Sequence, residues 1–158
     1  MKIFILLFLI SSVVFAQSST TNENNGKLIQ QIIKAQEDGW NKGDAKQYSR
    51  SFEEEGIYTI ITGATFHSRS SLEERVAFIL AGFFKNSTLS QKIVKTDFIA
   101  DNIVLVEIET EMTGYKSLPP GVKASADQKF RTSMLQVLNK TNEEWKVVAF
   151  HNVDIKVP

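Results

Sequence analysis

The sequence contains no cysteine, only three prolines and only two histidines among its 158 residues. Without cysteine no disulfide can form, so the fold must be held together by its core alone. The chain also has no excess of either charge, because eighteen basic and eighteen acidic residues cancel. No run of lysines or arginines forms the positive stripe that binding to phosphate backbones requires. Nucleic acid is therefore not expected as a partner.

Long apolar runs are missing as well, since none reaches the about 20 residues of a membrane-spanning helix. The longest lies within residues 1–16, MKIFILLFLISSVVFA, and is interrupted by Ser11 and Ser12. One lysine precedes this run, and Val14 and Ala16 stand where a signal peptidase requires small residues. We expect residues 1–16 to be a signal peptide, with a retained anchor as the alternative. The mature protein would be secreted or periplasmic, without a stable membrane anchor after cleavage.

Two further segments follow from composition. Residues 17–26, QSSTTNENNG, are polar without periodicity and indicate a flexible leader. The rest, residues 27–158, fits one globular domain, because the whole chain is 42% hydrophobic and 23% charged. No cysteine follows the expected cleavage point, which excludes a bacterial lipoprotein anchor.

The first half of this domain has the signals of helices and short strands. Apolar residues at helical spacing predict a helix over 27–40. Asp44 with Gln47 forms a capping box for a short helix through Phe52, and Ser70 with Glu73 forms another for a helix up to about Lys85. β-branched and aromatic residues predict strands at 56–62 and 65–68.

From Leu89 onward every apolar segment has the pattern of a strand. A hairpin turn at Asp101 and Asn102 joins the first two, and a loop over 114–124 leads to a strand at 129–138 and a final strand from Trp145. Early helices and late long strands predict an α+β fold. We expect one curved antiparallel sheet with about three helices across one face.

Alternation along the final strand assigns its residues to two faces. Lys146 belongs in water, so the Trp145 side is expected to face the helices and to carry His151 into the interior. In the preceding strand the inward set is Phe130, Thr132, Met134, Gln136 and Leu138. These residues predict an apolar lining with two polar groups beside His151.

The opposite face of the sheet is also apolar, at Leu135, Val137, Val148 and Phe150. Three short helices cannot cover both sides of the sheet, and an uncovered apolar patch of this size usually marks a subunit interface. A homodimer through this face is expected. The alternative is a set of scattered surface hydrophobic residues.

Three carboxylates alternate along one strand, at Glu107, Glu109 and Glu111. Lys129 and Arg131 alternate in the same way on another strand and can pair with them across the sheet. A solvated charged face is the favoured interpretation, and a metal row is the alternative. We expect no cofactor.

Two segments resemble the nuclear transport factor 2-like superfamily. GWNKGDAKQYSRSFEEEGIYT (39–59) is similar to its opening helices and first strand, and WKVVAFHNV (145–153) to the closing strand of its SnoaL-like branch, especially the SgcJ/EcaC group. The resemblance covers nearly all of the expected mature chain and implies a cone formed by a bent sheet wrapped over helices. The superfamily includes isomerases, dehydratases, cyclases, epoxide hydrolases and non-catalytic binding modules.

The resemblance also implies an aspartate inside the cone as acid or base, which this chain lacks among its expected inward residues. His151 as general acid or base and Tyr58 as donor to a developing oxyanion are the catalytic candidates. The alternatives for His151 are a histidine at the edge of the core, hydrogen-bonded to a neighbour, and a ligand contact without chemistry. Expected ligand contacts are Trp40, Phe83, Thr132, Met134, Gln136 and Asn152. The leading hypothesis is binding of a small apolar molecule in the cone. An isomerase or cyclase using His151 and a dimeric protein-interaction module are the alternatives.

Overall fold

The computed structural model describes residues 6–155. Within this range it has three helices and six strands. The helices are α1 (Leu6–Asn41), α2 (Ala45–Ser49) and α3 (Arg69–Ala81). The strands are β1 (Phe52–Thr59), β2 (Thr65–Ser68), β3 (Thr88–Ala100), β4 (Ile103–Thr113), β5 (Phe130–Thr141) and β6 (Glu144–Asp154).

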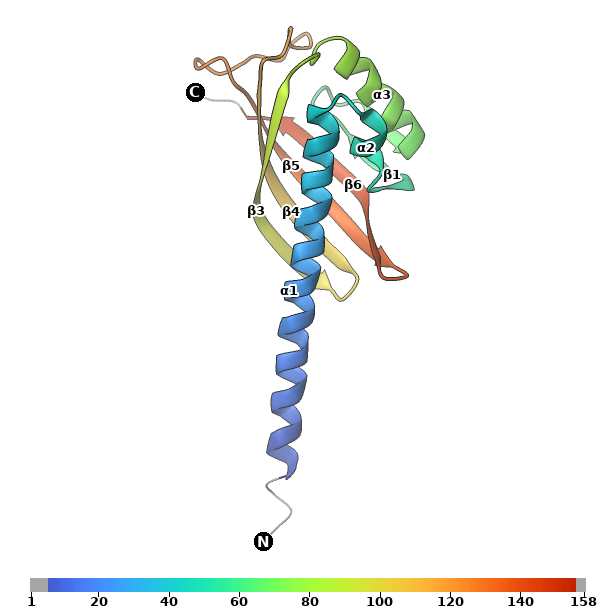
Figure 1. The fold of residues 1–158 in the computed structure, drawn as a ribbon, viewed down its shortest axis with the longest axis vertical. Coiled ribbons are helices and arrows are strands. Elements are labelled where there is room, and N and C mark those ends of the chain that lie inside the picture. Colours follow the sequence, from blue (N-terminus) through green and yellow to red (C-terminus); the bar gives the residue numbers. More distant parts are fainter. Residues whose placement is uncertain (1–5, 156–158) are drawn as a thin grey trace.

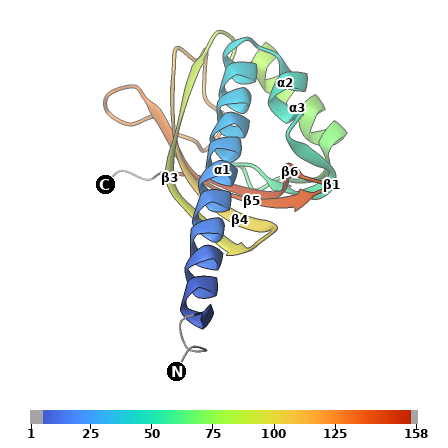
Figure 2. The same cartoon turned by 60° about the horizontal axis from the view of Figure 1, so that its bottom comes forward.

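The strands form a single curved sheet in the order β2-β1-β6-β5-β4-β3. Figures 1 and 2 show the helices gathered on one side of it, so the α+β architecture predicted from the sequence is confirmed. The prediction of a purely antiparallel sheet is wrong for one pair, because β1 runs parallel to β6. A parallel pair needs a long crossover connection, and here α3 and β3 to β5 supply it.

Helix α1 is longer than the sequence pattern predicts. The expected flexible leader, residues 17–26, lies inside the helix, where Glu23 and Lys27 form an ion pair at 2.8 Å across one turn. Asn25 is buried, and its Oδ1 accepts a hydrogen bond from Trp145 Nε1 at 3.3 Å. Packing of α1 against the sheet therefore begins at Asn25 rather than at Lys27. The polar composition of residues 17–26 gave no sign of this contact.

The predicted signal peptide is only partly within the described residues. Residues 1–5 lie outside them, and residues 6–16 form the first turns of α1, which project away from the sheet in Figure 1. Cleavage after Ala16 stays a prediction. In the described part of the chain, no helix has the length and apolarity needed to cross a membrane.

The helix caps agree with the sequence at one end and differ at another. Asp44 caps α2 as predicted, since its Oδ1 accepts from the backbone N–H of Gln47 at 2.9 Å. The predicted cap at Ser70 is wrong, because Ser68 caps α3 and accepts from the N–H of Ser71 at 3.2 Å. Ser68 has the extended backbone that a cap needs. Ser68 and Ser70 both lie in the serine-rich stretch SRSS, so the sequence alone does not distinguish them as caps.

Strand β6 contains the irregularity that decides the inner face. Val137 is opposite Ala149, whereas the next residue of β5, Leu138, is opposite Val147. Val148 is therefore an extra residue in β6, a bulge, and every side chain beyond it changes face. Trp145, Val147 and Phe150 are buried, while His151 is exposed.

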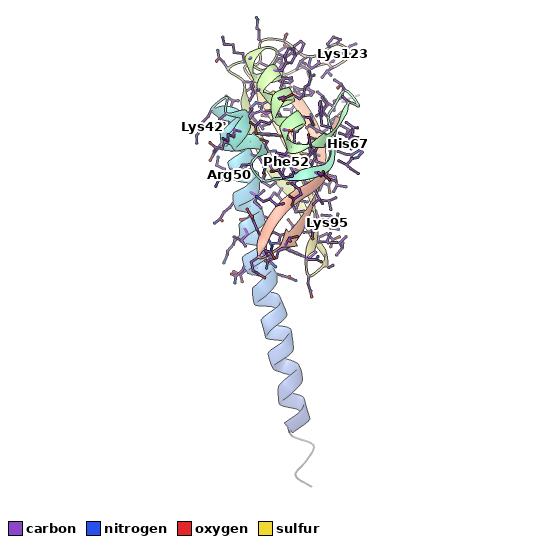
Figure 3. The ribbon with its side chains drawn as sticks, turned by 90° about the vertical axis from the view of Figure 1, so that its right-hand side faces the viewer. Lys42, Arg50, Phe52, His67, Lys95 and Lys123 are labelled. Atoms are coloured by element: carbon purple, nitrogen blue, oxygen red, sulfur yellow. The ribbon has the colours of Figure 1, made fainter. Side chains whose placement is uncertain are left out.

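An aromatic cluster fills the space between the helices and the β1–β6 end of the sheet. Phe52 contacts the rings of Tyr48, Tyr58 and Phe150 at centroid distances of 5.8, 5.2 and 5.7 Å. Figure 3 shows Phe52 within the body of the domain and Lys42, Lys95 and Lys123 at its periphery. The predicted outward position of Phe150 is wrong, because the bulge turns its ring into this cluster, where it is 3% exposed.

Candidate functional site

A cavity of about 70 Å³ lies between the concave face of the sheet and helices α1 to α3. Its wall is mostly apolar and comes from both halves of the chain. The helices and the segment after β1 contribute Trp40, Tyr48, Ile60, Ile61, Leu72, Val76, Ile79 and Phe84. The strands contribute Leu89, Met112, Phe130, Met134 and Phe150. This volume holds several water molecules, and it is smaller than the about 150 Å³ of a cavity that binds benzene.

Four buried polar atoms of the described residues have no hydrogen-bond partner, and all of them belong to residues that line this cavity. They are Arg75 Nε on α3, Gln91 Nε2 and Oε1 on β3, and Asn152 Oδ1 on β6. A buried polar group without a partner costs about 1–3 kcal/mol. Such atoms around an apolar cavity are the arrangement expected where a ligand supplies the missing partners.

Other polar side chains in the same interior have partners. The hydroxyls of Thr110 and Thr132 are 2.6 Å apart, and Trp40 Nε1 donates to Ser87 Oγ at 2.9 Å. Gln36 and Gln136 exchange hydrogen bonds, at 3.3 Å and 2.8 Å. These buried side chains are therefore hydrogen-bonded to one another. The described buried atoms without a partner all belong to residues of the cavity wall.

Among the described residues of the cavity wall, Arg75 is the one cation. It is half-buried, and no carboxylate of the described residues lies within ion-pair distance of it. Its guanidinium lies over the ring of Phe78, 5.4 Å from the centroid, a contact that holds the group without neutralising it. Arg75 was not among the site residues predicted from the sequence, because an arginine on an amphipathic helix is normally a solvent contact.

Neither predicted catalytic residue lines the cavity. His151 is exposed on the convex face, so the prediction that it points into the interior is wrong. Tyr58 is fully buried, and its hydroxyl donates to the backbone oxygen of Glu53 at 2.8 Å. Burial raises the pKa of Tyr58 to about 12. Its proton is committed to the backbone, away from the cavity.

The predicted ligand contacts divide into two groups. Trp40, Thr132, Met134 and Asn152 all line the cavity. Gln136 faces the same interior but lies against Gln36, outside the wall, and the wall residue at the end of α3 is Phe84 rather than Phe83. The bulge in β6 is the reason that Asn152, rather than His151, faces inward.

The loop between β4 and β5 forms part of the cavity rim through Pro119. Its first residues are tied to the end of α3, because the N–H groups of Lys116 and Ser117 both donate to the oxygen of Phe83. Its last residues are fixed by Arg131, whose Nη2 lies 2.6 Å from Asp127 and 2.8 Å from Glu111. Hydrogen bonds from Arg131 lower the pKa of Asp127 to about 2.

One glutamate of the row on β4 pairs with basic residues across the sheet. Glu111 is opposite Arg131 and accepts hydrogen bonds from both Lys129 and Arg131, which lower its pKa. The predicted cross-strand ion pairs are therefore confirmed for Glu111. Residues 6–155 contain no group of three or more histidine, aspartate or glutamate side chains placed to hold a metal ion.

A larger groove of about 830 Å³ runs along the outside of the domain, between α1, α2 and the turn joining β5 to β6. Most of its lining residues are polar or charged, including Asp44, Arg50, Arg69, Glu73 and Lys146. Several of these groups already have partners, for example Glu73 with Ser49 at 2.8 Å. None of the unpartnered buried atoms lies there, so the cavity inside the cone is the stronger candidate.

Comparison with solved structures shows the same architecture. A cystatin-like domain of unknown function from Nostoc punctiforme superposes with a TM-score of 0.70 at 17% identity, over 84% of this chain and 78% of that one. A hexachlorocyclohexane dehydrochlorinase, LinA type 3, from Novosphingobium barchaimii gives 0.72 at 8% identity, over 87% and 91%. A nuclear transport factor 2-like protein of unknown function from Shewanella oneidensis gives 0.62 at 17% identity, over 82% and 99%.

The chain has the nuclear transport factor 2-like fold. This confirms the cone that the sequence resemblance implies, while the narrower SgcJ/EcaC assignment stays a prediction. No family model and no curated protein matches the sequence. At these identities the likeness establishes the fold alone, so the function has to be argued from the cavity.

Proposed function

We propose that this chain binds a small, mainly apolar molecule in the cavity of the cone. The observation that carries the proposal is the set of unpartnered polar atoms of Arg75, Gln91 and Asn152 in an otherwise apolar wall. Apolar surface supplies affinity, and a few polar groups fix the orientation of the ligand. Apolar side chains at these positions would make the fold more stable, because a buried polar atom without a partner costs free energy. A role in binding explains why polar side chains occupy these positions.

The same wall argues against acid–base catalysis near neutral pH. Its described residues include no aspartate, glutamate, histidine or lysine. The ionisable groups present are Arg75 and Tyr48, and burial raises the pKa of Tyr48 to about 12. A general acid or base works best with a pKa near the working pH. The isomerase or cyclase hypothesis depended on an inward His151, and the bulge removes that support.

The methionines provide a direct test of binding. Two of the three in the chain, Met112 and Met134, line the cavity. Protein with ¹³C-labelled methionine methyl groups would be titrated with 1-propanol and 2-butanone. Both methyl resonances should shift in wild type. Absence of any shift at all concentrations below those at which the compounds unfold the protein would contradict the proposal.

A matched pair of variants locates the binding. Val76 is buried in the cavity wall, whereas its neighbour Ala77 is exposed. Val76→Phe fills the cavity and should abolish the shifts, while Ala77→Phe places the same ring in solvent and should leave them unchanged. Shifts that survive in Val76→Phe would mean that the molecules bind elsewhere. Native mass spectrometry of protein from its own host would then identify a retained ligand.

We also propose that the protein is exported and associates through the convex face of the sheet. Export is supported by the predicted signal peptide over residues 1–16. Association is supported by Ile57, Leu135 and Val153, which share that face around His151 and are 51%, 45% and 58% exposed. Apolar residues clustered on one face of a sheet are typical of an interface with a second copy of the chain.

A further inference from the structure

We propose that the ligand carries a carboxylate group held by Arg75, and that it is a short-chain monocarboxylate. This inference rests on the proposed function, because it specifies the molecule that the cavity of the cone takes. The cavity contains one positively charged side chain, two uncharged amide side chains with unpartnered atoms and otherwise mainly apolar surface. A ligand that complements this wall has one negative end and one apolar end.

The negative charge is assigned to the ligand because the protein supplies none at this position. Arg75 Nε is buried without an acceptor, and Arg75 forms no ion pair within the described residues. A guanidinium presents its N–H groups as a planar fork that matches the two oxygens of a carboxylate. The next inward residue of β6 after Asn152 is Asp154, and it is not part of the cavity wall.

The amide side chains favour an oxygen-rich head group over a purely apolar ligand. Both ends of the Gln91 amide are unpartnered, so it has a donor and an acceptor free whichever way the group is turned. Asn152 Oδ1 has no partner either. The Gln91 donor can add a hydrogen bond to the carboxylate, and water or a hydroxyl on the ligand can satisfy the acceptors.

The volume limits the apolar end. About 70 Å³ is less than a benzene-sized site, so the chain of the ligand must be short. Met112, Phe130 and Met134 provide apolar surface for it, and the flexible methionine side chains can adjust to its shape. Long-chain fatty acids and aromatic acids are too large for the cavity as it stands.

Three compounds of nearly the same shape test the charge. Propionate, propionamide and 1-propanol would be titrated into methionine-labelled wild type, with sodium chloride at equal concentration as the control for ionic strength and for simple anions. Propionate should bind about tenfold or more tightly than propionamide, because a charge-assisted fork replaces a neutral contact. Sodium chloride alone should produce no shift of Met112 or Met134.

The variants separate Arg75 from charge in general. Arg75→Gln should weaken propionate about tenfold and leave propionamide within about twofold. Arg75→Lys should recover only part of the loss, because an ammonium lacks the planar fork. Arg69→Gln removes a charge from the same helix, but Arg69 is paired with Glu54 and faces the outer groove, so it should change neither affinity.

The outcomes distinguish this inference from the function on which it rests. If propionamide and propanol bind as tightly as propionate, or if Arg75→Gln leaves propionate binding unchanged, the carboxylate assignment is wrong and the binding function stands. If none of the three compounds shifts either methionine methyl, both are overturned. A thermal melt of each variant shows that loss of binding is not loss of folding.

Discussion

The side-chain amides of Gln36 and Gln136, on α1 and β5, exchange hydrogen bonds in the fully buried interior. Gln36 Nε2 also donates to Ser51 Oγ at 3.0 Å, so one glutamine pair joins the long helix, the turn before β1 and the centre of the sheet. In the cavity wall, by contrast, the side-chain amide of Gln91 has no partner.

Replacing Gln136 or Gln91 by leucine should change the free energy of unfolding in opposite directions. Gln136→Leu leaves Gln36 Oε1 without its donor, although Gln36 Nε2 keeps Ser51, so the free energy of unfolding should fall by about 1–3 kcal/mol. Gln91→Leu removes two unpartnered atoms and should raise it by about 1 kcal/mol while weakening propionate binding. Urea denaturation of both variants checks the signs. A loss of stability in Gln91→Leu would show that its amide has a partner in solution.

His151 should be dispensable for the cavity. His151→Ala changes an exposed side chain, so stability should stay within about 0.5 kcal/mol and ligand affinity should not change. Deletion of Val148 is the informative companion, because Val147 and Ala149 already lie on opposite faces of the sheet. The shortened strand should therefore keep Phe150 inward and His151 outward, and the variant should keep its fold, as followed by circular dichroism. A folded deletion variant with His151 inside would contradict the register.

Association is tested at Leu135 rather than at Phe150. Leu135 is 45% exposed on the convex face and directly opposite His151, so Leu135→Lys should leave the fold intact. If two copies meet through this face, the lysine charges would be buried and the variant should sediment as a monomer where wild type is a dimer. Phe150→Lys, in contrast, buries a charge in the aromatic cluster and should unfold the chain. A monomeric wild type would refute the interface.

Acid should loosen the loop at the cavity rim. Because Arg131 lowers the pKa of Asp127 from its ordinary 3.8 to about 2, the ionised pair stabilises the folded loop above about pH 4. This contribution is lost as the pH falls through the folded pKa. Amide resonances of residues 114–129 should therefore change with a midpoint near pH 2, and Asp127→Asn should show the loosened loop at neutral pH. A midpoint near 3.8 would mean that the pair does not form.

Two glycines of α1 should respond to alanine in opposite ways. A Cβ at Gly39 would lie 2.4 Å from the backbone nitrogen of Tyr48, whereas one at Gly26 would meet nothing within 4 Å. Gly39→Ala should therefore destabilise by about 1–3 kcal/mol, because α1 and α2 can no longer approach. Gly26→Ala should stabilise by up to about 1 kcal/mol, if residues 17–26 are helical as the structure shows. Equal melting temperatures of wild type and Gly26→Ala would argue that Gly26 is not helical in solution.

The sequence predicts most elements because their signals are local. Asp44 marks its helix by a cap that spans three residues, and the hairpin between β3 and β4 follows from a two-residue turn. The beginning of β1 was predicted four residues late, since Glu53, Glu54 and Glu55 have little strand propensity. The strand starts earlier because Phe52 pairs with Val147 of β6 and Glu55 pairs with Ser68 of β2. The helical state of residues 17–26 depends on the distant contact between Asn25 and Trp145.

The candidate site is less predictable than the fold. Alternation on β5 correctly identified Thr132 and Met134, because that strand has no irregularity before Leu138. On β6 one extra residue reversed the assignment of everything after it, and no local pattern in WKVVAFHNV marks the bulge. Arg75 and Gln91 were missed because a polar residue on a half-buried helix or strand is normally a solvent contact. Only the packing of β3 and α3 around the same space reveals them.

The strand order makes β6 the join between the two parts of the sheet. On one side it pairs with β5, and through β5 with β4 and β3, and on the other side it alone connects the β1–β2 hairpin to the rest. Strand β1, residues 52–59, can pair with β2 early, but its second partner strand is β6, residues 144–154. Pairing across so long a stretch of sequence slows folding. During synthesis of this protein, the β1–β2 hairpin has no neighbouring strand in the sheet until β6 has been made. The sheet therefore cannot close into the cone before translation has passed Asp154.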